Sequence, residues 1–234
     1  MAAIKLNSSR QRSGAAGILL LALLAILVVV FRPWDAGSAQ HVPIGAAAAL
    51  QLVHEARVCG SPATDQYANV QESCLLASPV ARWWREARAE LGPAAVTASM
   101  RVHIERRADY DGMAVRWGIG HTQPSVEACA HACLTHEPVP QSGHLDELPC
   151  NAFVWCAAEG GCWEPDIHKH SFGDCWLKFT EGPAAPEVNM RGELSQRQRS
   201  QHPDAPTEVQ WHAGAVLPRG VELRNGSWSP RYEW

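Results

Sequence analysis

The sequence of 234 residues lacks the short motifs by which many enzymes are recognised. It contains no H-E-x-x-H zinc-protease helix, no G-x-S-x-G nucleophile turn and no glycine loop of the kind that binds phosphate. Gly118 and Gly120 form a G-x-G pair, but the third glycine of a dinucleotide-binding turn is missing. We therefore expect a protein that is not an enzyme and that carries no cofactor.

A strong charge of either sign is also missing. The formal net charge is -4, from 20 Lys and Arg against 24 Asp and Glu, and the pI is near 6.2. Nucleic acids and anionic membrane surfaces attract proteins through basic patches, so this balance predicts no nucleic-acid partner. The chain also has no internal repeat, no Gly/Ser linker and no long charge block, which predicts one ordinary domain with a smaller appendage.

An uncharged apolar run covers residues 14–31, directly after three basic residues within residues 1–13. Its roughly 18 residues would span about 27 Å as a helix, close to the thickness of a bilayer core. Basic residues before the run and no acidic residue until Asp35 predict a cytosolic N-terminus and export of everything that follows. We expect a signal anchor, and hence a single-pass type II membrane protein of the secretory pathway or cell surface.

The alternative is a cleaved signal peptide and a secreted protein. Gly37 and Ala39 are small residues with the spacing of a signal-peptidase site. Both alternatives export the rest of the chain. All eight cysteines follow Phe31, and an even number of cysteines in an oxidising compartment predicts disulfides.

Residues 44–94 have helical periodicity. In SPVARWWREARAELGP, Ser78 is a suitable N-cap, Pro79 suits the first helical position, and Gly92 followed by Pro93 should end the helix. At helical spacing one face carries an apolar stripe, and such a stripe usually faces the core: Val80, Trp83, Trp84, Ala87 and Leu91. Earlier helices near residues 46–58 and 65–77 would cover this stripe, and Cys59 with Cys74 can join their ends.

A sheet-containing domain is predicted over residues 98–217. The alternation of Met100, Val102 and Ile104 with polar residues predicts a half-buried strand, and 114–117 is a short second strand candidate. A helix follows, capped by Ser125, and one of its faces carries Val126, Cys129, Ala130, Cys133 and Leu134. Because the two cysteines are four residues apart, they point to the same side, toward the core.

Two further strands are predicted at CNAFVWC and at residues 174–179. The alternation in the first places Cys150, Ala152, Val154 and Cys156 on one face, and Asn151, Phe153 and Trp155 on the other. Phe153 and Trp155 are weak candidates for ligand binding. Residues 181–207 are predicted to form a long mobile loop, 210–217 an edge strand, and 218–234 a tail.

These residues resemble the PAN/apple domain, in the divergent form of plant and green-algal exported proteins. The resemblance rests on Cys129-x3-Cys133, CNAFVWC, CWLKF and the later Trp211-x-x-Gly214, and it covers about residues 108–217. It implies an α+β fold in which one helix packs across a disulfide-stapled antiparallel sheet. It also implies the pairs Cys133–Cys150 and Cys129–Cys175, which leaves Cys156–Cys162 as a local bridge and Cys59–Cys74 outside the domain.

Other chemistries remain open at the same residues. The Cys and His side chains of CAHAC, HEPVPQSGH and the loop with Asp166, His168 and His170 are candidate metal ligands, although a helical C-x3-C without a second tight pair does not match a zinc finger. A small lumenal enzyme of unrecognised chemistry is a further alternative. Asn225 lies in an Asn-Gly-Ser glycosylation sequence on the exported side.

The resemblance implies a non-catalytic extracellular or lumenal binding module that recognises a protein or a carbohydrate. The ten tryptophans agree with this function, because exposed aromatic rings stack on sugars and anchor protein contacts. The sequence does not identify the ligand.

Overall fold

The computed structural model describes residue 59, residues 70–139 and residues 147–229. The chain divides into two units, Met1–Val42 and Pro43–Trp234, and every described residue belongs to the second. The predicted membrane-spanning run at 14–31 and the predicted helix at 46–58 lie outside the described residues. Within the described part of the chain, no helix combines the length and the apolar character needed to cross a bilayer.

Three short helices precede the sheet: α4 (Glu72–Ala77), α5 (Pro79–Leu91) and α6 (Pro93–Ser99). Ser78 caps α5 as predicted, because its Oγ accepts a hydrogen bond from the backbone N–H of Ala81 at 3.3 Å. The prediction that Gly92 and Pro93 end this helix is confirmed, because Leu91 is its last residue. Gly92 turns the chain with φ 82°, and Pro93 then opens α6 at the first helical position, where its missing N–H costs no hydrogen bond.

The predicted apolar stripe of α5 is confirmed for its central residues. Val80, Trp84 and Ala87 are buried, but Leu91, the last residue of α5, is 43% exposed where the chain turns at Gly92. The Arg88 guanidinium lies 4.4 Å from the centre of the Trp84 ring and covers it. Trp84 belongs to the same apolar cluster as core residues of the sheet, so the helical segment and the sheet share one core.

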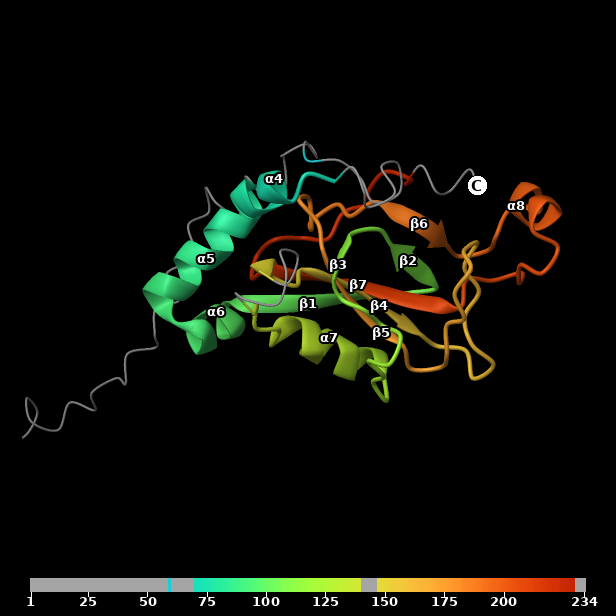
Figure 1. Ribbon diagram of the computed structural model, residues 1–234, viewed down its shortest axis with the longest axis horizontal. Coiled ribbons are helices and arrows are strands. Elements are labelled where there is room, and N and C mark those ends of the chain that lie inside the picture. Colours follow the sequence, from blue (N-terminus) through green and yellow to red (C-terminus); the bar gives the residue numbers. More distant parts are fainter. Residues whose placement is uncertain (1–58, 60–69, 140–146, 230–234) are drawn as a thin grey trace, which may run out of the picture. The chain divides into compact units, whose positions relative to one another are not determined.

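The domain is α+β, with a five-stranded antiparallel sheet in the order β1-β7-β4-β5-β3 (Figure 1). The strands are β1 (Met100–Arg106), β3 (Met113–Arg116), β4 (Ala152–Cys156), β5 (Cys175–Phe179) and β7 (Trp211–Pro218). The prediction of an edge strand at 210–217 is wrong, because β7 pairs with β1 on one side and with β4 on the other. Its nearly continuous apolar sequence suits a strand buried on both faces.

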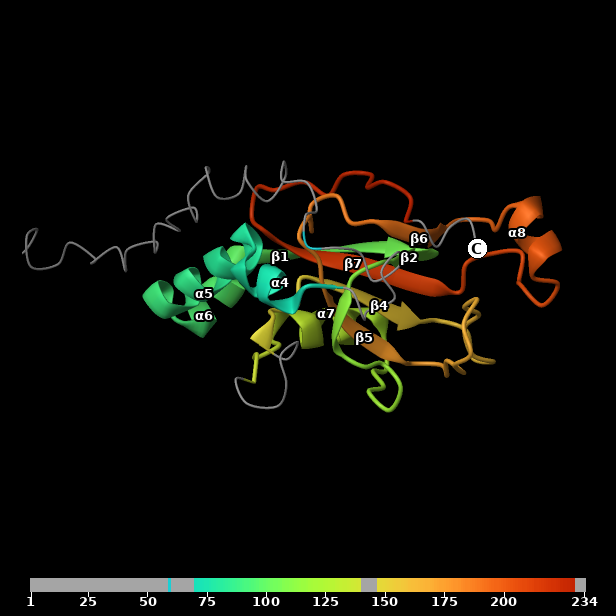
Figure 2. The same ribbon diagram turned by 45° about the horizontal axis from the view of Figure 1, so that its top comes forward.

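Helix α7 (Val126–Leu134) packs across one face of this sheet (Figures 1 and 2). The predicted cap is present, since Ser125 Oγ accepts a hydrogen bond from Ala128 N at 3.1 Å. Both helical cysteines are fully buried. Two disulfides therefore hold the helix to the sheet region, Cys129–Cys175 and Cys133–Cys150.

The eight cysteines form four disulfides, with Cα–Cα distances between 5.2 and 5.7 Å. Besides the two at α7, Cys156–Cys162 closes a short loop after β4, and Cys59–Cys74 lies in the helical region. These are the four pairs that follow from the resemblance to the PAN/apple domain.

A two-stranded sheet of β2 (Ala108–Tyr110) and β6 (Val188–Arg191) packs on the opposite face, against β7 and β4 (Figure 2). The prediction of a mobile loop over 181–207 is therefore wrong. This segment contains β6 and helix α8 (Gln196–Gln201), and Ser195 and Gln198 form a reciprocal capping box. Val188 and Met190 are buried and fix β6 on the sheet.

The predicted faces of β4 need one correction. Cys150 shares a core with Phe153 and Trp155, whereas Val154 and Cys156 belong to the opposite cluster. The reason is that β4 begins at Ala152, so the alternation does not extend back to Cys150. Phe153 and Trp155 are 0% and 7% exposed on the face covered by α7, so the ligand-facing interpretation of these two rings is wrong.

Close packing explains both residues of the Trp211-x-x-Gly214 motif. A Cβ on Gly214 would lie 2.3 Å from Cζ of Phe153 and 2.4 Å from the carbonyl oxygen of His103. Gly214 thus makes room for the ring from β4. Trp211 is 1% exposed in the opposite cluster, and its Nε1 donates to the carbonyl oxygen of Trp163 at 3.0 Å. The tryptophan in this way connects β7 to the loop after β4.

Candidate binding cavity

The candidate site lies in the connection between β4 and β5, residues 157–174. Two contacts fold this connection back on itself: the Cys156–Cys162 disulfide and the hydrogen bond from Cys162 N to His170 O at 3.0 Å. At its base, Gly173 N donates to Cys156 O at 3.0 Å. Gly161 has φ 96°, and a Cβ there would lie 2.4 Å from His170 O, so only glycine fits this turn.

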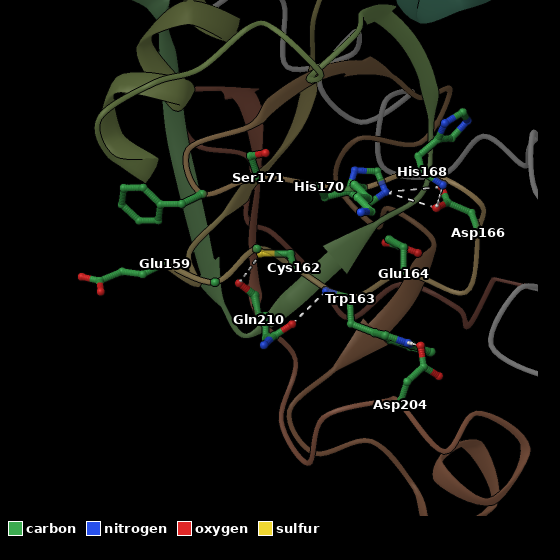
Figure 3. Close-up of a pocket in the computed structure, with 14 residues that line it drawn as sticks. Glu159, Cys162, Trp163, Glu164, Asp166, His168, His170, Ser171, Asp204 and Gln210 are labelled. Carbon is green, nitrogen blue, oxygen red and sulfur yellow. Dashed lines mark hydrogen bonds and ion pairs between the residues drawn. The ribbon is translucent and has the colours of Figure 1, made fainter.

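An open cavity of about 580 Å³ lies within this loop and against Asp204 and Gln210 (Figure 3). Its volume is within the range of roughly 300–1,000 Å³ that is usual for small-molecule sites. Four carboxylates line it, Glu159, Glu164, Asp166 and Asp204, together with the rings of Trp163, His168, His170 and Phe172. The cavity therefore offers both hydrogen-bonding groups and flat apolar surface.

The Trp163 ring is held from outside the loop. Its backbone N–H donates to Gln210 Oε1 at 2.8 Å, and its indole Nε1 donates to Asp204 Oδ2 at 3.2 Å (Figure 3). The His202 ring stands edge-on with its centre 5.5 Å from that of Trp163. Residues 202–210 thus fix one aromatic wall before any ligand arrives.

The Asp166–His170 pair forms a second wall. His170 Nε2 lies 3.3 Å from Asp166 Oδ1, and the same oxygen accepts from His168 N at 2.9 Å. Burial acts to raise the pKa of Asp166, but the hydrogen bonds from the His170 side chain and the His168 backbone outweigh it, so the pKa of Asp166 lies below its usual value. Asp166 is therefore ionised at neutral pH.

His170 has one ring nitrogen without a partner in the described part of the chain. Its side chain is 4% exposed, with the rings of Trp176 and Trp211 at 5.8 and 5.2 Å. Because the carboxylate of Asp166 only accepts hydrogen bonds when ionised, Nε2 carries a proton. Nδ1 is buried and makes no hydrogen bond to a described residue.

Further aromatic side chains are exposed beside the cavity. Trp117, 57% exposed, lies 5.0 Å from the Trp176 ring and 6.2 Å from that of His168. Phe172, 44% exposed, lines the cavity itself. Gly118 permits this arrangement, since a Cβ there would lie 2.1 Å from Cδ1 of Trp176.

Sequence analysis singled out three residues of this site, but as candidate metal ligands rather than as part of a binding cavity. Asp166, His168 and His170 were candidate metal ligands, but in the described ranges no three Cys, His, Asp or Glu side chains are grouped so that they could hold a metal ion. Trp163, Asp204 and Gln210 were missed. Asp204 and Gln210 are 41 and 47 residues from Trp163 in sequence, and no local pattern signals their contact with it.

The predicted glycosylation site lies away from the cavity lining. Asn225 is exposed after β7. The next residues are held against β6: Ser227 O accepts from Val188 N at 2.9 Å, and a Cβ on Gly226 would lie 1.7 Å from Pro186 O. The side chain of Asn225 is thus presented to solvent from a fixed backbone, and its modification stays a prediction.

Comparisons of the chain with protein-family models, with curated proteins and with solved structures found no match.

Proposed function

We propose that this protein is an exported, non-catalytic binding module of the PAN/apple type, and that it binds carbohydrate in the cavity between β4 and β5. The observation that carries the proposal is the composition of the cavity, where four carboxylates and four rings line about 580 Å³. Sugars present hydroxyl groups at their edges and C–H groups on their faces. A site that combines acceptors with flat rings matches both surfaces.

The PAN/apple assignment is supported by the helix–sheet arrangement. One helix lies across an antiparallel sheet, and two disulfides join that helix to the start of β5 and to the residue two before β4. This is the pairing that the resemblance implied, and CNAFVWC, CWLKF and Trp211-x-x-Gly214 all lie in the sheet or directly beside it.

Export is supported by the state of the cysteines. All eight are paired, and paired cysteines persist in the secretory lumen and outside the cell rather than in the cytosol. We propose that residues 14–31 anchor the chain in the membrane, with a secreted form as the alternative, and that Asn225 is glycosylated.

The site is organised before binding. The indole of Trp163 is fixed by hydrogen bonds at both its backbone and its ring nitrogen, and the loop that carries it is closed by Cys156–Cys162. A ligand that stacks on a fixed ring loses less conformational entropy than one that must order it.

A protein partner is the second candidate. Three large apolar side chains are exposed on neighbouring loops, Trp117 at 57%, Ile119 at 47% and Ile167 at 94%. Exposed apolar residues near one another favour contact with another protein. The metal-binding alternative gains no support, because the described residues contain no suitable group of three ligands.

The test is a glycan array probed with the detergent-solubilised full chain, made in a eukaryotic secretory pathway. We expect retention of a defined glycan, and a loss of about tenfold or more in affinity for Phe172→Ser and Glu159→Gln, equivalent to about 1.4 kcal/mol. Both side chains are exposed at the cavity, so the fold should tolerate the changes. Glu90→Gln, an exposed carboxylate on α5, is the matched control.

Two outcomes would contradict carbohydrate binding at this site. One is a glycan that binds both cavity variants as tightly as the unmodified chain. The other is an array without any retained glycan, together with a protein partner whose binding is lost in Trp117→Ser. That second outcome would favour the protein-binding candidate.

A further inference from the structure

We propose that this protein forms a twofold homodimer in which β1 of one copy pairs antiparallel with β1 of a second copy. The two five-stranded sheets would then become one continuous sheet. The inference does not depend on the proposed carbohydrate binding. It starts from the position of β1, which is the outermost strand on one side of the sheet, where only β7 among the described strands pairs with it.

The two edges of the five-stranded sheet differ. On one edge, β3 has four residues, three of them buried, and its register shifts between Ala114 and Arg116. A short, covered and bulged strand is a common protection against pairing with another chain. On the other edge, β1 has seven residues in unbroken register with β7, contains no proline or glycine, and buries only Met100. The edge at β1 is therefore both accessible and regular enough for pairing.

The backbone of β1 directs hydrogen-bonding groups away from the sheet. Val216 of β7 lies opposite Val102, but its N–H donates to Asn151 O at 3.0 Å, on the side of β4. Successive positions of an antiparallel strand alternate in direction, so the N–H and C=O of Val102 point away from β7, and those of Ile104 do the same. No other described strand pairs with these outward groups.

A twofold axis at His103 matches the side chains of two such strands. In that register Val102 lies opposite Ile104 of the second copy, so their outward backbone groups can bond to each other. Ile104, which is 36% exposed, gains an apolar neighbour. Arg101 lies opposite Glu105 of the second copy, a pair of opposite charge on one face. Because the contact is isologous, each match occurs twice.

Neighbouring registers match less well. An axis at Val102 would place Arg101 opposite His103, two basic side chains. An axis at Ile104 would place Val102 opposite Arg106, an apolar side chain against a charged one. Like or mismatched cross-strand pairs are less stable than complementary ones, so the sequence of β1 favours the axis at His103.

The charged groups near the axis are ordered for this contact. Arg101 is exposed, and the Glu105 carboxylate is held by Arg191, whose Nε donates to it at 2.5 Å, while its side chain stays 26% exposed. Burial lowers the pKa of His103, and Arg101 lowers it further, against the effect of Glu222. The two His103 rings are therefore neutral at neutral pH and do not repel each other.

The register predicts one specific cross-link. Opposite residues at a position that is not hydrogen-bonded have Cα atoms about 4.5 Å apart, which suits a disulfide. Mild oxidation of the detergent-solubilised full chain should therefore join His103→Cys into a covalent dimer. Arg101→Cys is the matched control, since its two copies would lie four positions apart along the strands, about 13 Å, too far for a bridge. Circular dichroism checks that both variants keep the fold.

Sedimentation equilibrium in density-matched detergent measures association without a cross-link. We expect a monomer–dimer equilibrium for the full chain, weakened at least about tenfold by Ile104→Lys, because a lysine at a strand edge opposes pairing. Ile119→Lys is the matched control, an exposed isoleucine outside β1 that should leave the equilibrium unchanged. Both isoleucines are exposed, so the fold should tolerate the changes.

Three results would overturn the inference. One is a full chain that stays monomeric at about 100 μM, a concentration at which even a weak specific dimer is populated. Another is a dimer of equal strength in Ile104→Lys, which would place the contact elsewhere, for example in the apolar run at 14–31. The third is cross-linking of Arg101→Cys as fast as that of His103→Cys, which would exclude the register.

Discussion

The two faces of the five-stranded sheet are stabilised in different ways. On one face, α7 is held by Cys129–Cys175 and Cys133–Cys150 above an apolar core. On the other, the described residues contain no disulfide between the β2–β6 sheet and the larger one, and buried polar groups connect them. Lys178 Nζ on β5 lies 3.4 Å from Asp109 Oδ1 on β2, and within the smaller sheet Asn189 Nδ2 donates to Asp109 Oδ2 at 2.7 Å.

This difference shows that disulfides on one face and buried polar contacts on the other both hold an element against the same sheet. A helix meets the sheet through side chains alone, so disulfides fix its position. The two-stranded sheet packs on an apolar cluster of its own and adds the buried Lys178–Asp109 pair, because a buried charge without a partner is costly. The contribution of each face to stability can be tested by removing a contact that only that face has, a disulfide at α7 or the ion pair at β2.

The largest effect is expected at the helix-covered face. The double substitution Cys129→Ala with Cys175→Ala opens a loop with a sequence separation of 46, whereas Cys156→Ala with Cys162→Ala opens one of 6. Chain entropy predicts losses in the free energy of unfolding of about 4 and about 2 kcal/mol. Denaturant unfolding of both variants measures this. A larger loss for the short loop would contradict the role of the helix bridges.

The opposite face should respond strongly to the loss of its buried cation. Lys178→Met leaves the Asp109 side chain, 1% exposed, without its cationic partner, so we expect a loss of about 3 kcal/mol in the free energy of unfolding. The matched control is Lys169→Met, an exposed lysine, with a change within about 0.5 kcal/mol. Equal denaturation midpoints for the two variants would show that the buried pair does not hold β2 in place.

A third change tests the close approach of β7 and β4 beneath α7. Gly214→Ala places a methyl group 2.3 Å from Cζ of Phe153, and such overpacking costs about 2 kcal/mol. Gly160→Ala is the control, since a Cβ there has no heavy atom within 4 Å. Thermal unfolding should separate the two variants, and an unchanged melting temperature for Gly214→Ala would contradict the packing account of this glycine.

The smallest effect is expected for the dependence of stability on pH. Burial lowers the pKa of His121 and outweighs the hydrogen bond to Cys175 O, which acts to raise it, while Arg116 lowers it further. A lowered folded pKa means that the unfolded chain binds more protons as the pH falls below about 6.5, so stability is lost from there down to the folded pKa. His103, also lowered by burial, acts in the same direction.

The melting temperature should accordingly fall between about pH 7 and about pH 5, and the fall should be smaller in His121→Asn. A fall of the same size in His121→Asn would assign the pH dependence to other groups.

The two faces also differ in how well the sequence predicted them. Helical periodicity and a capping serine predicted α7, because both signals are local, and the resemblance to the PAN/apple domain implied its two bridges. β2 and β6 have three and four residues with polar side chains between apolar ones, and their partners are distant: Asp109 meets Asn189, 80 residues away. A segment whose polar groups find distant partners looks like a loop in the sequence, which explains the wrong prediction for 181–207.

The sequence predicted the cavity less well than α7 but better than the β2–β6 sheet. In the loop after β4, the sequence indicated Asp166, His168 and His170 as candidate ligands. It could not show that His170 is buried against Trp176 and Trp211. Nor could it show that Asp204 fixes the Trp163 ring. The residues predicted from the sequence thus lie in the loop that forms the cavity, but the properties of the cavity depend on contacts between residues that are distant in sequence.

The most direct test of the central claim, that ligand binds in the cavity between β4 and β5, is a titration followed by amide chemical shifts. Isotopically labelled full chain in detergent would be titrated with a glycan that the array retains. We predict that the shifted amides cluster in the loop 159–172 and at Asp204 and Gln210, where the cavity lies. Shifts confined to α5, α6 or the β2–β6 sheet would place the ligand elsewhere and contradict the claim.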